Sequence, residues 1–239
     1  MSVLYLVRHG QAGTRENYDS LSELGRRQSR LLGEYFASQG IRFELAFSGS
    51  LARQRSTAEE IRASSGDALP EVVVDPGWDE FDLAHVYTEL APHLAASDAD
   101  FRREFEEMQR AVIASQGAHD APVHRRWNDC DKLVVRSWVE GRYPYSGESW
   151  EAFCERVIAA LARAVAPRRQ GNTIVFTSAT PIGVCAARML DIMDGRAMWL
   201  AGVLLNASYS TFRVRESEIR LFSLNTTPHL DHPELRTFR

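Results

Sequence analysis

The hydrophobic and polar positions of this chain follow two alternating periods. Residues 3–7 (VLYLV) form a continuous apolar run, which is typical of a central strand buried on both faces. Further strands are predicted at 45–48, 72–74 and 173–177, and an antiparallel pair at 208–214 and 219–224.

Helices are predicted between these strands. Ser22 is a candidate N-cap for a helix with apolar residues at helical spacing that ends near Gly40. A second helix is predicted from about Leu51 to Ala63. Because strands and helices alternate without a long linker, we expect an α/β protein, a three-layer α/β/α sandwich with a central, mostly parallel sheet.

Residues 82–148 interrupt this alternation. The segment 101–113 has a helical and heavily charged pattern, and 115–131 is mixed in character. We interpret 82–148 as a mostly helical insert that covers one side of the sheet above a site. The 239 residues are then one domain with an insert.

Composition and charge narrow the functional classes. The chain is 44% hydrophobic with a net charge of −4, so neither disorder nor a long basic surface for nucleic acid is expected. The longest apolar run, 197–205, is too short to cross a bilayer. The three cysteines and the immediate start of a strand predict reduced thiols in a cytoplasmic protein.

The tripeptide Arg8-His9-Gly10 follows the first buried strand directly. In α/β sheets, ligands bind beyond the carboxyl ends of the strands, so these residues are expected to face a pocket. A histidine there can act as a nucleophile, and an arginine can neutralise the group that it attacks. A strand-end histidine bonded to a backbone carbonyl is the alternative interpretation.

Further motifs follow in order along the chain. They are LVRHGQA at 6–12, Asp19, LSELG at 21–25, FSGSLAR at 47–53, GESW at 147–150 and NAS at 206–208. This ordered set resembles the histidine phosphatase superfamily, the group that includes cofactor-dependent phosphoglycerate mutases. The resemblance covers the chain outside roughly 82–143.

The resemblance implies roles for individual residues. His9 would accept the phosphoryl group, and Arg8 and Arg53 would hold the phosphate with forked guanidinium groups, which suit its oxygens. Gly10 and Asn206 would belong to the same phosphate pocket. Glu80 is similar in placement to the proton donor of the family, although Asp79 and Asp82 beside it leave that assignment open.

One position departs from the family pattern. Where members of the family have a second pocket histidine after the late strand, this chain has Ala179 within FTSATP at 176–181. Losing one such donor typically lowers the rate by about 10²–10³. Hydroxyl groups of Ser178 or Thr180, or the backbone amides of the following helix, would replace part of it.

Other chemistry-bearing residues carry weaker signals. His119, His124, Cys130 and Asp131 lie close together in sequence but match no zinc spacing, so we expect an exposed loop and no metal. Arg125 and Arg126 with Trp127 are either ordinary surface residues or a site for an anionic tail. The apolar stretch 198–205 is either core or a face of a homodimer.

We therefore expect a metal-independent phosphomonoester hydrolase that acts on a small phosphorylated substrate through phospho-His9 and needs no cofactor. The alternative is a phosphoester-binding protein with little or no turnover, which Ala179 motivates. A phosphoglycerate mutase is disfavoured, because the run after Glu80 has no arginine to pair with a substrate carboxylate.

Overall fold

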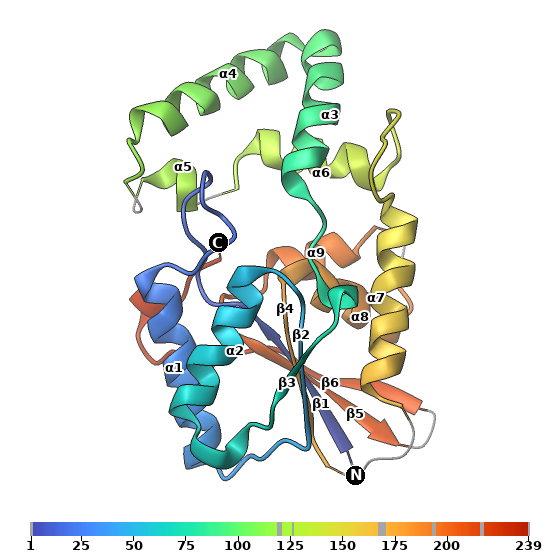
Figure 1. Ribbon diagram of the computed structural model, residues 1–239. Helices are drawn as coiled ribbons and strands as arrows, with labels where there is room; N and C mark the ends of the chain where they lie inside the picture. The colour runs from blue at the N-terminus through green and yellow to red at the C-terminus, as the bar shows by residue number, and fades with distance from the viewer. Residues whose placement is uncertain are drawn as a thin grey trace.

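A computed structural model describes residues 2–118, 121–125, 127–166, 171–192, 195–215 and 218–238. A six-stranded sheet with the strand order β3-β2-β4-β1-β5-β6 forms its centre (Figure 1). The strands are β1 (Ser2–Arg8), β2 (Leu45–Ser48), β3 (Val72–Val74), β4 (Thr173–Thr177), β5 (Tyr209–Arg215) and β6 (Glu218–Thr226).

The sheet is mostly parallel, as predicted. Strands β3, β2, β4 and β1 pair in parallel, and β5 and β6 complete the sheet by antiparallel pairing. Arg8 lies opposite Thr177, and Ser48 lies opposite both Phe176 and Val74. The carboxyl ends of all four parallel strands therefore meet at one edge of the sheet.

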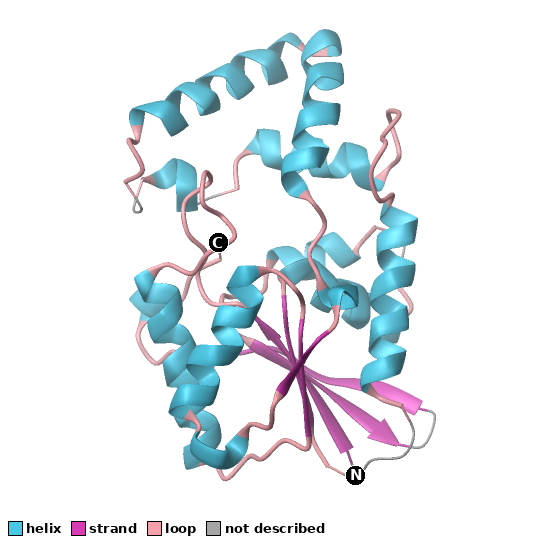
Figure 2. Cartoon of the chain, viewed as in Figure 1, coloured by secondary structure: helices cyan, strands magenta, loops and turns pink. Residues whose placement is uncertain are grey.

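Helices cover both faces of the sheet, which confirms the α/β sandwich (Figure 2). Side chains on β1 alternate between the two layers: Tyr5 and Val7 pack with Phe36 on the side of α1 (Glu23–Ser38) and α2 (Ala52–Ser64). Leu4 and Leu6 face the opposite layer, which contains α7 (Trp150–Ala164), α8 (Ala179–Leu190) and α9 (Ala197–Gly202). Burial on both faces is the reason that β1 has no polar side.

The start of α1 is determined locally. Ser22 is its N-cap, and its side chain accepts a hydrogen bond from the backbone N–H of Gly25 at 3.0 Å. Gly25 also packs directly against the loop after β1. A Cβ added at Gly10 would lie 2.3 Å from the Gly25 carbonyl oxygen, so this close approach requires glycine at position 10.

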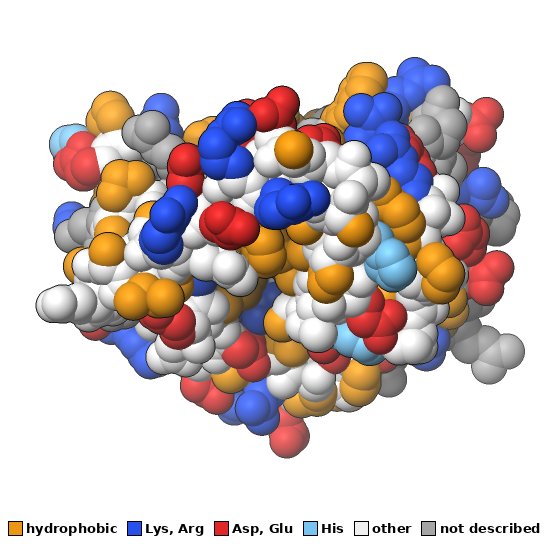
Figure 3. Space-filling model, turned by 90° about the horizontal axis from the view of Figure 1, so that it is seen from above, with side chains coloured by type: hydrophobic (Ala, Val, Ile, Leu, Met, Phe, Trp, Pro, Cys, Tyr) orange, Lys and Arg blue, Asp and Glu red, His pale blue; other side chains and the backbone are white. Residues whose placement is uncertain are grey.

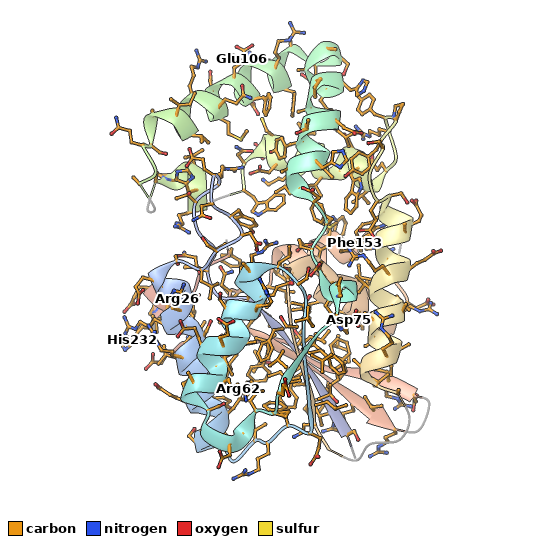
Figure 4. All side chains as sticks on the ribbon, viewed as in Figure 1. Arg26, Arg62, Asp75, Glu106, Phe153 and His232 are labelled. Atoms are coloured by element: carbon orange, nitrogen blue, oxygen red, sulfur yellow. The ribbon has the colours of Figure 1, made fainter. Side chains whose placement is uncertain are left out.

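Residues 82–148 supply four helices that stand apart from the sheet in Figure 1. They are α3 (Leu83–Ser97), α4 (Ala99–Ala114), α5 (Pro122–Arg125) and α6 (Asp129–Val139). Aromatic contacts join them to the rest of the protein: Phe81 stacks on Trp138 with 4.5 Å between ring centroids, and Trp138 meets Phe153 of α7 edge to face. Side chains from both parts project into the space between them (Figure 4).

Among the described residues, three short 3₁₀ helices lie at Gly66–Ala68, Pro76–Trp78 and Pro233–Leu235. The three cysteines are buried free thiols, and burial raises the pKa of each. Within the described residues, none of the helices combines the length and the apolar character that spanning a bilayer requires.

Candidate active site

A large cavity opens at the carboxyl edge of the parallel strands. Its volume is about 1850 Å³, and it separates this edge from helices α3 and α6. The residues at the sheet side of the cavity come from the ends of four strands and include Arg8, His9, Arg53, Glu80 and Ala179. The topology thus brings together segments that are far apart in the sequence.

The backbone and the ring of His9 are both held in place. Its N–H donates to the Thr177 carbonyl at 2.9 Å, and its carbonyl accepts the N–H of Ala207 at 3.1 Å. The ring nitrogen Nδ1 lies 2.7 Å from the Gly10 carbonyl oxygen. Because a carbonyl only accepts, Nδ1 carries the proton and Nε2 keeps a lone pair.

His9 is only 2% exposed, which explains its protonation state. Burial is the main cause that lowers its pKa well below the ordinary value, and the charges of Arg53 and Arg8 lower it further. The imidazole is therefore neutral near neutral pH. A neutral imidazole with a lone pair on Nε2 is the nucleophilic form of histidine.

Arg53 lies beside the reactive nitrogen. Its Nε is 3.3 Å from His9 Nε2, and its Nη1 is 3.0 Å from Asp19 Oδ1. Asp19 also accepts the backbone N–H groups of Ala52 and Arg53, at 3.0 and 3.2 Å, so it caps the start of α2. The Tyr18 ring lies 4.9 Å from the guanidinium carbon. The arginine is thus oriented from two sides.

Arg8 is held by the C-terminal part of the chain. One guanidinium nitrogen, Nη1, donates to the Leu204 carbonyl, and Nη2 donates to the Phe238 carbonyl at 2.6 Å. Thr237 in turn bonds to Asn206 and Gln28 through its hydroxyl group, at 2.9 Å each. The last described residues therefore contribute to the position of an arginine at the opposite end of the sequence.

The carboxylates of Asp79, Glu80 and Asp82, in the segment that leads from β3 to α3, have different surroundings. Asp79 accepts the N–H and the hydroxyl of Ser50, both at 2.5 Å, and Asp82 caps α3 by accepting the His85 N–H. Glu80 is partly buried in the cavity wall and accepts the Thr180 N–H at 3.2 Å. Burial raises the pKa of Glu80, against opposing hydrogen bonds from Thr180.

The structure places Ala179 and Thr180 in the cavity wall but not Ser178. Ser178 is fully buried, and its hydroxyl accepts a hydrogen bond from Gln54 at 2.9 Å. The Ser178 hydroxyl therefore belongs to the interior, where Gln54 also donates to the Trp78 carbonyl. The expectation that it compensates for Ala179 as a phosphate ligand has no geometric support.

Gly10 and Asn206 also lie outside the cavity wall. The N–H of Gly10 donates a hydrogen bond to Thr57 Oγ1 at 3.0 Å, so this N–H is already used within the protein. Asn206 is fully buried and donates to the His9 carbonyl at 3.3 Å. Both residues therefore form hydrogen bonds within the protein next to His9, and their expected contact with a phosphate stays a prediction.

The loop after His9 is tied to the insert through a buried ion pair. Arg15 contacts both carboxylate oxygens of Asp131, at 2.9 and 2.6 Å, and Asp131 is fully buried. The hydroxyl of Tyr87 donates to the same carboxylate. The backbone N–H of Arg15 also donates to His124 at 3.2 Å.

These contacts give two of the candidate metal-ligating residues a structural role. His124 and Asp131 both bond to Arg15. Within the described ranges, no group of three His, Cys, Asp or Glu side chains is arranged to hold a metal ion. His119 and Arg126 lie outside the described residues.

The profile of the histidine phosphatase superfamily (branch 1) matches residues 4–136 and 115–227. The chain belongs to this superfamily. Among curated proteins, it is 25% identical over 204 residues to a 2,3-bisphosphoglycerate-dependent phosphoglycerate mutase of Methylorubrum populi. That match covers 81% of this chain and 79% of the mutase.

Solved structures of superfamily members share the fold. Phosphoserine phosphatase of Entamoeba histolytica, in complex with 3-phosphoglyceric acid, superimposes with a TM-score of 0.61 at 18% identity, over 96% of this chain and 100% of that one. The alpha-ribazole phosphatase of Shigella flexneri gives a TM-score of 0.60 at 18% identity, over 94% and 96%. At these identities the likeness concerns the fold alone.

Sequence reasoning missed the residues that hold the candidate site in place. The motifs include Asp19 but predict no role for it, and they predict neither the contact of Gln54 with Ser178 nor the Arg15–Asp131 pair. Asp19 lies more than thirty residues before Ala52 and Arg53 in the sequence, so no local pattern predicts that it contacts the start of α2. Only its backbone and side-chain contacts reveal that it orients Arg53.

Proposed function

We propose that this superfamily member is a metal-independent phosphomonoesterase that works through a phosphohistidine at His9. Nε2 of His9 attacks phosphorus, the P–O bond of the ester breaks, and protonated Glu80 transfers its proton to the leaving oxygen. Water then attacks phosphohistidine while Glu80 takes up one proton, and inorganic phosphate leaves. Both steps balance without an added co-reactant.

The observation that carries this proposal is the pairing of a neutral nucleophile with a cation at the reactive nitrogen. The 3.3 Å contact between Arg53 Nε and His9 Nε2 supports it, because a guanidinium group beside the reactive nitrogen would be next to the oxygens of a phosphoryl group bound there. Arg8 supplies a second guanidinium group at the same end of the cavity. Forked cations match the charge that develops on equatorial oxygens.

Glu80 is our choice for the proton donor because its neighbours have other partners. The Asp79 carboxylate accepts hydrogen bonds from Ser50, and the Asp82 carboxylate accepts the His85 N–H at the start of α3. The raised pKa of Glu80 increases its protonated fraction, which an acid catalyst requires. Glu80 also lines the cavity that His9 faces.

Hydrolysis of p-nitrophenyl phosphate in the presence of EDTA tests the proposal. We expect His9→Ala to lose activity by about 10⁴-fold or more, as removal of a nucleophile does. His232→Ala is the matched control, because His232 has a 64% exposed side chain and does not line the cavity. Alkaline quenching followed by mass spectrometry should detect phosphate on the peptide that contains His9.

Activity retained by His9→Ala, or activity abolished by EDTA, would refute the mechanism. A binding role without turnover is the second candidate, and the apolar side chain of Ala179 in the cavity wall favours it. In that case vanadate should raise the melting temperature of the wild-type protein, since it binds only the native state, while no phosphomonoester is hydrolysed.

The curated mutase relative favours a third activity, transfer of phosphate between positions of phosphoglycerate. The structure offers little for the substrate carboxylate at this point, because Phe81 and Asp82 follow Glu80 and Asp82 is itself an acid. Conversion of 3-phosphoglycerate in the presence of a bisphosphoglycerate primer would establish mutase activity. We expect no such conversion.

A further inference from the structure

The cavity is far larger than a phosphate site. Its volume of about 1850 Å³ exceeds the roughly 300–1,000 Å³ that is usual for small-molecule pockets. It extends from His9 at the sheet edge to α6 of the insert and to α9. A phosphorylated three-carbon acid would leave most of this space in contact with water only.

Aromatic rings from separate segments line this space. They come from the loop after β1, the residue before the insert, α3, the segment before α6, the start of α7, α9 and the C-terminal segment. These residues are Tyr18, Phe81, Tyr87, Trp127, Trp150, Trp199 and Phe238. Because the segments are distant in sequence, the sandwich and the insert together create one aromatic wall.

Two of these aromatic residues are largely exposed to solvent. The side chain of Trp199 is 74% exposed and that of Phe238 is 54% exposed. Aliphatic side chains, including Val135 and Val139 of α6, continue the same wall. A contiguous apolar surface that is open to solvent and adjoins a catalytic group is a typical binding surface for an apolar ligand.

Carboxylates accompany the two basic residues that α6 contributes to this wall. Lys132 Nζ lies 2.8 Å from Asp129, and Arg136 Nε lies 2.7 Å from Glu140. Glu151 also lines the cavity. The face of the molecule above the insert likewise shows basic and acidic side chains interspersed among hydrophobic ones (Figure 3). A second anionic group on the substrate would therefore meet a carboxylate next to either of these two cations of α6, while Arg125 and Arg196 also line the cavity.

We propose, on the basis of the proposed function, that the preferred substrate is a phosphomonoester of a bulky aromatic alcohol. The phosphate lies between His9, Arg8 and Arg53. The aromatic leaving group packs on the wall that includes Trp199 and Trp127. Ring-to-ring contacts of this kind contribute beyond simple burial of apolar area.

Three primary alkyl phosphates test this substrate class with one leaving-group chemistry. They are ethyl phosphate, 3-phenylpropyl phosphate and 3-carboxypropyl phosphate. We expect kcat/KM for the phenylpropyl ester to exceed that for the ethyl ester by about 30-fold, which corresponds to partial burial of one ring in an open cleft. The phenylpropyl ester should also exceed the carboxypropyl ester, because the ring and not a second charge is the group that the wall binds.

Trp199→Ala should reduce the phenylpropyl-to-ethyl ratio about fivefold or more. Phe222→Ala is the matched control, since Phe222 is an aromatic residue of 59% exposure on β6 that does not line the cavity, and it should leave the ratio unchanged. A ratio near one, preference for the carboxypropyl ester, or equal effects of both variants would overturn this substrate class alone. Failure to hydrolyse these esters and p-nitrophenyl phosphate alike would overturn the proposed function as well.

Discussion

Replacing Asp131 by leucine should destabilise the protein by about 4 kcal/mol, because it leaves a buried cation without its carboxylate. Asp131 is fully buried, and the Arg15 side chain is only 12% exposed. The carboxylate accepts two hydrogen bonds from Arg15, at 2.9 and 2.6 Å, one from Tyr87 and one from the Asn128 N–H at 2.9 Å. Breaking one partner of such a pair typically costs about 3–5 kcal/mol.

The double variant Arg15→Met/Asp131→Leu separates the charge effect from lost packing. It removes both charges, and we expect it to be destabilised by less than either single variant, since apolar pairs often replace buried ion pairs at little net cost. Urea unfolding of the four proteins measures the free energy of unfolding and the coupling between the two sites. Additive effects of the two single substitutions would refute this reasoning.

The Asp131→Leu substitution should also affect the candidate active site. Arg15 lies in the loop that joins His9 to Asp19, and Asp19 positions Arg53. We expect Asp131→Leu to lower kcat/KM about tenfold or more at a temperature where it is folded, because small displacements of a positioned group are costly in rate. Asp129→Asn is the control: its pair with Lys132 is exposed, so the change in stability should stay within about 0.5 kcal/mol.

Three further predictions concern pH and the chain terminus. Because the pKa of His9 is lowered, kcat/KM should decline on the acid side only well below pH 6.5, where His9 becomes protonated. On the alkaline side kcat/KM should decline as Glu80, whose pKa is raised, loses its proton. Glu80→Gln should abolish the alkaline decline, and an unchanged pH profile in this variant would contradict the assignment of Glu80. Burial lowers the pKa of His229 to about 4, so the unfolded state binds more protons between that pH and about 6.5, and stability should fall by up to about 3 kcal/mol from about pH 7 to pH 4. Urea unfolding at the two pH values should show a smaller fall in His229→Gln, and an equal fall in both proteins would assign the effect elsewhere. Deleting residues 237–239 removes the Phe238 carbonyl from Arg8 and should lower kcat/KM about tenfold or more, while removal of Arg239 alone serves as the control; full activity after the longer deletion would show that Arg8 needs no support from this segment.

Strands and helices of the sandwich were predictable because their signals are local. The apolar runs at 45–48, 72–74 and 173–177 coincide with β2, β3 and β4, and Ser22 caps α1 as its side chain indicated. For β1 and β4, burial on both faces leaves a continuous apolar run that can be recognised without knowing the neighbouring strands, whereas β3 is an edge strand in which Val73 and Val74 are exposed. The order of the strands, with β4 between β1 and β2, has no local signal.

By itself, the sequence determined the superfamily and the sandwich and supplied the prediction that His9 reacts beside Arg8 and Arg53, since these depend on short motifs and on residue types. Tertiary structure alone decided which groups face the cavity. Gly10, Ser178 and Asn206 were all expected at the phosphate, yet each has an internal partner and lies behind the wall. Hydrogen-bond partners and cavity walls arise from contacts between distant segments, so proximity along the chain to His9 or Ala179 does not reveal the direction in which a side chain points.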